Sequence, residues 1–170
     1  MIRRFYYLFF VSSLFLACHK TPETDTYNST NWSDRYLKPH SKNTWAYGKT
    51  YLSIYSQIYS MSQHKTHNLT AMASMRNISD TDTLYILSAK YYDSHGQLIR
   101  TFFNEPIYLA PLETTEAIIE EFDDSGGTGS NFIFEWQKPA NAPDPLFEGI
   151  MNSTLGQQGL SFTTTGVRMK

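Results

Sequence analysis

Short runs rich in Tyr, Ile, Phe and Thr recur from Thr50 onward, roughly every 8–14 residues, and this spacing constrains the fold more than any other feature of the chain. Clusters of Gly, Asp, Asn, Ser and Pro separate the runs. Such punctuation is typical of all-β proteins, in which each run is a strand and each cluster is a turn. The pattern therefore predicts an antiparallel β-sandwich or barrel.

Two segments show the clearest strand patterns. Thr83–Tyr92 is apolar on both faces for most of its length, which is typical of a central strand. In Asn131–Gln137 the residues Phe132, Phe134 and Trp136 alternate with their neighbours, so this aromatic face should point into the core. The other predicted strands are Tyr51–Tyr59, His67–Asn77, Gln97–Phe103, Ile107–Ala110, Glu113–Phe122, Leu146–Asn152 and Leu160–Thr165.

The N-terminus has the order of a bacterial lipoprotein signal: two arginines, the apolar run Phe5–Leu16, then Ala17 and Cys18. The alternative, an uncleaved membrane-spanning helix, needs about 20 apolar residues, and this run is shorter. We therefore expect a helical signal peptide over residues 1–17 and a lipid on Cys18. His19 follows the cysteine where aspartate would favour inner-membrane retention. We expect the cell envelope of a Gram-negative bacterium, and there the outer membrane, with the protein facing the periplasm.

The segment after Cys18 is polar and shows no sustained apolar pattern up to about residue 47. We predict a flexible tether over residues 18–47 and a single β-sandwich domain over residues 48–170. Trp32, Tyr36 and Trp45 leave two interpretations of this segment open. They either pack back onto the domain or give the tether a peptide-binding role.

Charge and cysteine content exclude several classes of function. The chain has 14 Lys and Arg against 16 Asp and Glu, and removal of a leader with Arg3 and Arg4 leaves 12 against 16. The basic residues stand singly, so we expect no nucleic-acid partner. Cys18 is the only cysteine, which excludes an internal disulfide and a multi-cysteine metal site.

Motifs of catalysis are absent from the sequence. His64 and His67 are close enough to share a metal, but residues three apart on a strand face opposite sides. No Gly-x-Ser-x-Gly turn occurs, and no serine has a sequence context that suggests an activating histidine. The acidic stretch from Glu113 to Asp124 lacks the ligand spacing of a calcium loop. We expect no enzyme activity and no cofactor.

Two surfaces are candidates for binding a partner. If Leu52, Ile54 and Ile58 of the first predicted strand face the core, its tyrosines face outward, and phenol rings make favourable contact surfaces. The other candidate is the glycine-rich loop Asp123–Ser130, in which exposed amides would bind a polar ligand. Both sets also have a structural interpretation, as an edge cover and a tight turn. The candidate residues are Tyr51, Tyr55 and Tyr59 for the strand, and Asp124, Ser125, Gly126, Gly127, Asn131, Gln157 and Gln158 for the loop.

Four fragments resemble a family of bacterial exported proteins that is known only as a domain of unknown function. They are Tyr91-Tyr92-Asp93-x-x-Gly96, Leu109-Ala110-Pro111, Ser125-Gly126-Gly127-x-Gly129-x-Asn131-Phe132-x-x-x-Trp136 and Gln157-Gln158-Gly159-x-Ser161-Phe162. The resemblance covers roughly residues 50–166 and implies an immunoglobulin-like β-sandwich in the periplasm, of about 7–9 strands. It implies no reaction. We therefore expect a lipid-anchored envelope module that binds an envelope protein or has a structural role. A small-ligand or carbohydrate-binding module is the alternative, and a divalent-metal or hydrolytic role is third.

Overall fold

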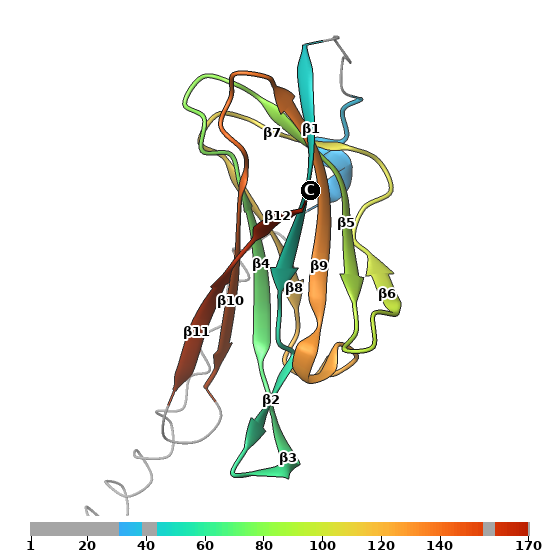
Figure 1. The fold of residues 1–170 in the computed structure, drawn as a ribbon, viewed down its shortest axis with the longest axis vertical. Helices are drawn as coiled ribbons and strands as arrows, with labels where there is room; N and C mark the ends of the chain where they lie inside the picture. Colours follow the sequence, from blue (N-terminus) through green and yellow to red (C-terminus); the bar gives the residue numbers. More distant parts are fainter. Residues whose placement is uncertain (1–30, 39–43, 155–158, 170) are drawn as a thin grey trace, which may run out of the picture.

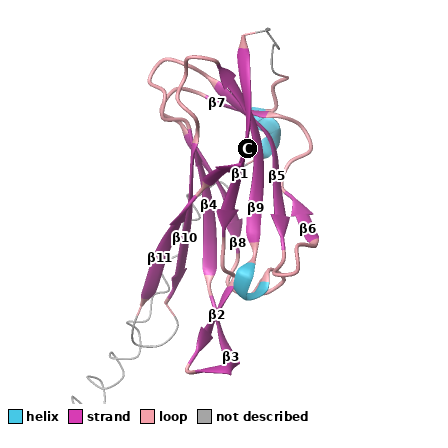
Figure 2. Ribbon diagram, viewed as in Figure 1, coloured by secondary structure: helices cyan, strands magenta, loops and turns pink. Residues whose placement is uncertain are grey.

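The computed structural model describes residues 31–38, 44–154 and 159–169, and within them the protein is a sandwich of two antiparallel β-sheets (Figures 1 and 2). The six-stranded sheet has the order β12-β1-β9-β5-β6, with β7 also paired to β5, and the four-stranded sheet has the order β11-β10-β4-β8. The strands of the first sheet are β1 (Trp45–Ser53), β5 (Leu84–Tyr92), β6 (Leu98–Thr101), β7 (Ile107–Leu109), β9 (Asn131–Pro139) and β12 (Val167–Met169). Those of the second are β4 (Thr70–Arg76), β8 (Thr114–Ile119), β10 (Leu146–Ser153) and β11 (Leu160–Thr165).

Two further strands and two 3-10 helices complete the described chain. The strands β2 (Gln57–Ser60) and β3 (Ser62–Asn68) pair with each other as a hairpin that projects below the sandwich in Figure 1. The 3-10 helices are η2 (Trp32–Arg35) and η3 (Gly127–Gly129). The predicted all-β sandwich is therefore confirmed. The described residues hold twelve strands rather than the expected seven to nine, because the sequence pattern did not separate β2 from β1 or β3 from β4 and did not reveal the three-residue β12.

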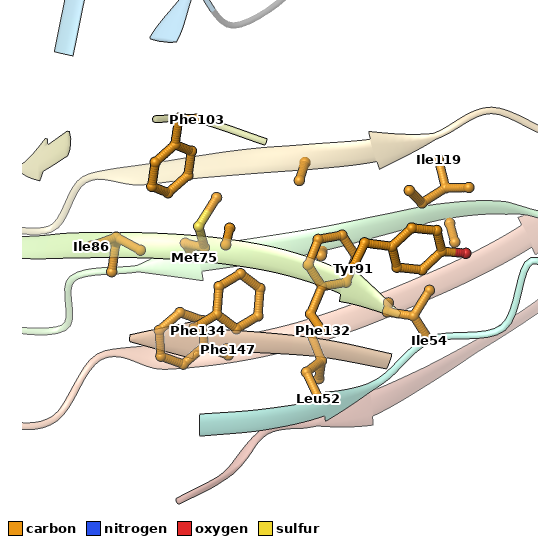
Figure 3. Packing of buried hydrophobic residues seen from close by; sticks show 14 of the residues in the cluster. Leu52, Ile54, Met75, Ile86, Tyr91, Phe103, Ile119, Phe132, Phe134 and Phe147 are labelled. Atoms are coloured by element: carbon orange, nitrogen blue, oxygen red, sulfur yellow. The ribbon is translucent and has the colours of Figure 1, made fainter. Parts of the chain in front are cut away.

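The core lies between the sheets and is built on a row of aromatic rings (Figure 3). Phe132, Phe134 and Trp136 of β9 are fully buried, as their alternation predicted. Phe132 stacks on Tyr91 of the neighbouring strand β5 with ring centroids 5.0 Å apart. Phe134 stacks on Phe147 of β10 in the opposite sheet at 4.3 Å. The row therefore joins two strands of one sheet and also bridges the two sheets.

Trp136 occupies space that a glycine leaves open. Gly48 of β1 lies directly opposite Trp136 in the register, and a Cβ at Gly48 would lie 2.1 Å from the indole ring. The indole N–H donates a hydrogen bond to the hydroxyl of buried Thr50, at 2.9 Å. A large ring with a satisfied polar atom thus fills the cross-strand position that lacks a side chain.

The first predicted strand, Tyr51–Tyr59, is wrong as a single element. β1 ends at Ser53, and the chain bends before it continues as β2 in the separate hairpin. The bend is held because Ile54 N–H donates to the Ser130 carbonyl at 3.0 Å, and Leu69 N–H donates to the Ser56 carbonyl at 2.9 Å. Alternate burial continues through the bend, with Leu52, Ile54 and Ser56 all buried, so the apolar pattern does not reveal the break. The predicted strand His67–Asn77 is divided in the same way between β3 and β4.

Part of the predicted tether lies against the domain. β1 begins at Trp45, three residues before the predicted boundary. The ring of Trp32 packs on Phe103 with centroids 5.1 Å apart, and Arg35 forms an ion pair with Glu113 at 2.6 Å. For Trp32 the packing interpretation is therefore correct. The predicted signal peptide and Cys18 lie outside the described residues.

Replacement of Trp136 by alanine should lower the free energy of unfolding by ~3–5 kcal/mol, because it removes a fully buried aromatic side chain and leaves a cavity. Urea denaturation of the wild-type and Trp136→Ala proteins measures the difference. An unchanged midpoint would place the indole outside the cooperative core.

Gly48→Ala should lower the free energy of unfolding by about 1–3 kcal/mol, because the added methyl group overlaps the Trp136 ring. Gly159→Ala is the matched control, since a Cβ at Gly159 meets nothing within 4 Å. Thermal melting of the two variants compares them. Equal melting temperatures would show that the indole is free to move away from β1.

Candidate functional site

The glycine-rich loop Asp123–Ser130 lies at the lower end of the sandwich, where η3 is drawn in Figure 2, and it is bonded to the β5–β6 turn. The Gly126 carbonyl accepts hydrogen bonds from both the backbone N–H and the hydroxyl of Ser94, at 3.2 and 3.1 Å. The Gly129 N–H donates to the same Ser94 hydroxyl at 2.9 Å. Several of the loop's polar backbone groups are therefore already used within the protein.

The end of the loop is tied to the core. The Tyr91 hydroxyl donates to Ser130 Oγ at 3.2 Å, and the Ser130 hydroxyl donates to the Ile54 carbonyl at 2.8 Å. A third contact joins the Ser56 hydroxyl to the Gly127 carbonyl at 3.2 Å. These bonds hold the loop against the bend that follows β1.

Gly126 is required by close packing. The residue is buried, and a Cβ there would lie 1.8 Å from the Tyr91 hydroxyl oxygen and 2.7 Å from Ser130 Oγ. Burial also raises the pKa of Tyr91, so its hydroxyl keeps its proton and remains a hydrogen-bond donor. Gly126 therefore has a structural reason to be glycine. Gly127 has another, because its φ of +68° lies in the left-handed region.

Asp123 carries the strongest local electrostatic interaction of the loop. Its carboxylate pairs with Arg100 of β6 at 2.5 Å and accepts a hydrogen bond from the Ser125 hydroxyl at 2.5 Å. Partial burial of Asp123 opposes ionisation, but the hydrogen bonds from Ser125 and Arg100 outweigh it and hold the pKa below its usual value. Asp124 and Ser125 are exposed, and Asn131 is the half-buried first residue of β9. Gln157 and Gln158 lie outside the described residues.

The three candidate tyrosines do not form one surface. Tyr51 is half-buried on β1, and Tyr55 lies in the bend, where its ring packs on Phe162 with centroids 5.9 Å apart. Tyr59 lies on β2 and is 62% exposed. The division of the first predicted strand separates them, so the predicted row of three phenols is wrong.

The β2–β3 hairpin carries an exposed apolar tip. Met61, in the turn between the two strands, is 95% exposed and has a φ of 65°, which is unusual for a residue with a side chain. Tyr59 lies two residues before it. The hairpin includes Lys65, His64 and His67 and no acidic residue. Its base is fixed, because Ile58 packs against the core cluster. We call Tyr59 and Met61 the hairpin tip.

A polar cluster that the sequence did not indicate lies at the base of the hairpin. A His67 ring nitrogen, Nε2, is 3.0 Å from Ser153 Oγ, and the Ser153 hydroxyl donates to Glu121 at 3.0 Å. The residues come from β3, β10 and the segment after β8, and no local motif links them. In a nucleophile–base pair the hydroxyl donates to histidine, and the carboxylate orients that histidine. Here the Ser153 hydroxyl donates its hydrogen bond to the carboxylate, and Ser153 is buried, so the cluster ties three segments together.

The described residues contain neither a metal site nor a membrane-spanning helix. His64 and His67 both lie on β3, and no group of three or more His, Cys, Asp and Glu residues in the described ranges is placed to hold a metal ion. Among the helices that the structure describes, none is long and apolar enough to cross a membrane.

Gly126→Ala should reduce the free energy of unfolding by about 1–3 kcal/mol, because the methyl group overlaps the Tyr91 hydroxyl. The same change in a Tyr91→Phe background should cost less, since the overlapping oxygen is gone. Gly129→Ala is the control, because its Cβ would meet only the Ser94 side chain, at 3.4 Å or more. Urea denaturation of the wild type, the two single variants at positions 91 and 126 and the double variant gives the coupling between these positions. If the changes in the free energy of unfolding at positions 91 and 126 simply add, the loop does not depend on contact with the Tyr91 hydroxyl.

Comparison with known proteins agrees with the resemblance seen in the sequence fragments. A solved structure described as "Crystal Structure of Thermotoga maritima 1070" superimposes with a TM-score of 0.44 and 10% identity, over 71% of this chain and 92% of that chain. No curated protein matches the chain significantly. The model of the family described as "Protein of unknown function (DUF3124)" matches residues 47–169, from the third residue of β1 to the last residue of β12. The chain therefore belongs to this DUF3124 family.

Proposed function

We propose that this protein is a lipid-anchored, periplasm-facing module of the bacterial envelope that binds another envelope protein through the tip of its β2–β3 hairpin. The lipid on Cys18 holds the sandwich at the outer membrane. The sandwich is a rigid body that presents the hairpin, and the partner contributes an apolar surface that covers Tyr59 and Met61. No catalytic step is part of this function.

The exposed hairpin tip carries the proposal. Met61 and Tyr59 are among the most exposed large apolar residues in the described chain, and they lie two residues apart on an element that projects from the sandwich (Figure 1). Aromatic residues and Met are enriched at protein interfaces because they give a large contact area. Lys65 supplies a positive charge beside the tip. The partner surface should therefore combine apolar groups with acidic ones.

The glycine-rich loop supports a ligand-binding function less well. Its carbonyls at Gly126 and Gly127 already accept hydrogen bonds from Ser94 and Ser56. Asp123 is engaged by Arg100 and Ser125. A ligand would have to compete with these internal bonds, so we place the contact on the hairpin and treat the loop as its support.

The anchor has its own test, because Cys18→Ser removes the thiol that would receive the lipid. Cells that express the variant should incorporate no labelled fatty acid into the protein, whereas the wild-type chain should be labelled and should sediment with outer-membrane fractions in a sucrose gradient. Labelled lipid on the Cys18→Ser protein would refute this anchor.

The contact is tested by a photo-crosslinking amino acid at position 61 of the full chain in intact cells. Irradiation should give a discrete adduct with one envelope protein, and Lys65→Glu should reduce the yield several-fold because it reverses the charge beside the tip. Leu112 is the matched control position, since it is also an exposed apolar residue, at 69%, with a positive φ of 58°. Leu112 lies in the loop between β7 and β8, whereas Met61 lies in the hairpin turn between β2 and β3. No adduct at position 61, or equal adducts at both positions, would contradict the proposed contact.

A further inference from the structure

Among the residues that the structure describes, the strand β11 is an unprotected edge of the four-stranded sheet. It pairs with β10 over six consecutive residues, Leu160 to Thr165, without a register shift, and it is the first strand in the order β11-β10-β4-β8. Its sequence, Leu-Ser-Phe-Thr-Thr-Thr, has no charge and no proline. Such an edge presents unpaired backbone N–H and C=O groups to any strand that approaches it.

The other edges in the described chain have features that prevent such pairing. β7 and β12 have three residues each, and β7 is also covered because Leu37 N–H donates to the Pro106 carbonyl at 3.0 Å. β6 has four residues, a register shift opposite β5 and the charge of Arg100. β8 carries Glu116, and β3 carries Lys65. Short length, charge, bulges and covers are the usual means of blunting an edge, and within the described chain β11 has none of them.

We propose that β11 is the interface between two copies of this chain, which pair antiparallel through it. The two four-stranded sheets would then form one continuous sheet of eight strands across a two-fold axis. Pairing of this kind satisfies the outward backbone groups of both edges with main-chain hydrogen bonds.

The composition of β11 favours a second copy as the occupant. In a two-fold antiparallel interface the residue at the axis faces its own copy, so a charge at that position would meet a like charge. β11 is neutral at all six positions. With Thr163 at the axis, Ser161 lies opposite Thr165 of the second copy and the two Thr163 residues face each other. Ser and Thr pairs across strands form favourable side-chain hydrogen bonds.

The edge is also held in place before any partner arrives. On its inner face, the Thr164 hydroxyl donates to the Ser53 carbonyl of β1 at 2.6 Å, and Phe162 packs on Tyr55. At its end the Gly166 N–H donates to the Phe147 carbonyl at 2.8 Å, and a Cβ at Gly166 would lie 2.8 Å from Thr50. An edge fixed at three points loses little conformational entropy on pairing.

Substitutions that introduce a charge at position 163 test the proposal in the full, lipidated chain in detergent. Thr163 is exposed, so Thr163→Lys and Thr163→Glu should each fold and keep the wild-type circular dichroism spectrum. Native mass spectrometry should show dimers of the wild-type chain and mainly monomers of each variant, because like charges meet at the axis. An equimolar mixture of the two variants should recover a mixed dimer. Thr101→Lys, on the β6 edge, is the matched control and should dimerise as the wild type does.

Cross-linking in membranes gives an independent measurement. In the Thr163→Cys protein, a short bis-maleimide should produce a covalent dimer, whereas Thr101→Cys and the parent chain with Cys18 alone should not. A monomeric wild-type chain, dimers in both single-charge variants, or a Thr163→Cys adduct with a different protein would each overturn the proposal. None of these results bears on the hairpin contact, which is measured at position 61.

Discussion

The stacked aromatic row on β9 is the interaction on which the rest of the structure depends. Phe134 reaches across to Phe147 and joins the sheets, and Trp136 fills the space above Gly48. The row continues through Phe132 to Tyr91, and the Tyr91 hydroxyl holds Ser130 at the start of β9. One set of side chains therefore links the two sheets and also fixes the glycine-rich loop. The loop's conformation follows from core packing.

The lower end of the sandwich is consequently divided into a fixed part and a free part. The loop is bonded to Ser94, to the bend after β1 and to the core. Among the described residues, the β2–β3 hairpin is held at its base, through Ile58 and the contact of His67 with Ser153, and its tip is exposed. An exposed apolar tip on a rigid base suits recognition of a partner, whereas a loop with satisfied backbone groups suits support. This division is the reason that we propose the hairpin as the binding surface.

Alternation allowed much of the sandwich to be predicted, because the two-residue period of a strand is local. The buried face of Phe132, Phe134 and Trp136 and the central position of β5 follow from it. The same signal failed between Tyr51 and Tyr59, where burial alternates through a bend that Ser130, far along the chain, holds in place. The cluster of His67, Ser153 and Glu121 depends on contacts between distant segments. Such contacts have no local signature, so the site was less predictable than the fold.

Backbone hydrogen exchange in the folded full chain tests this division of the lower end most directly. The account predicts that the amides of Gly127 and Gly129 exchange slowly, because both donate hydrogen bonds within a loop that is held by the core. Amides near Met61 should exchange much faster, through local opening of the hairpin tip, while those of β9 should be the slowest of all. Fast exchange at Gly127 and Gly129, or a hairpin tip as protected as β9, would contradict the account.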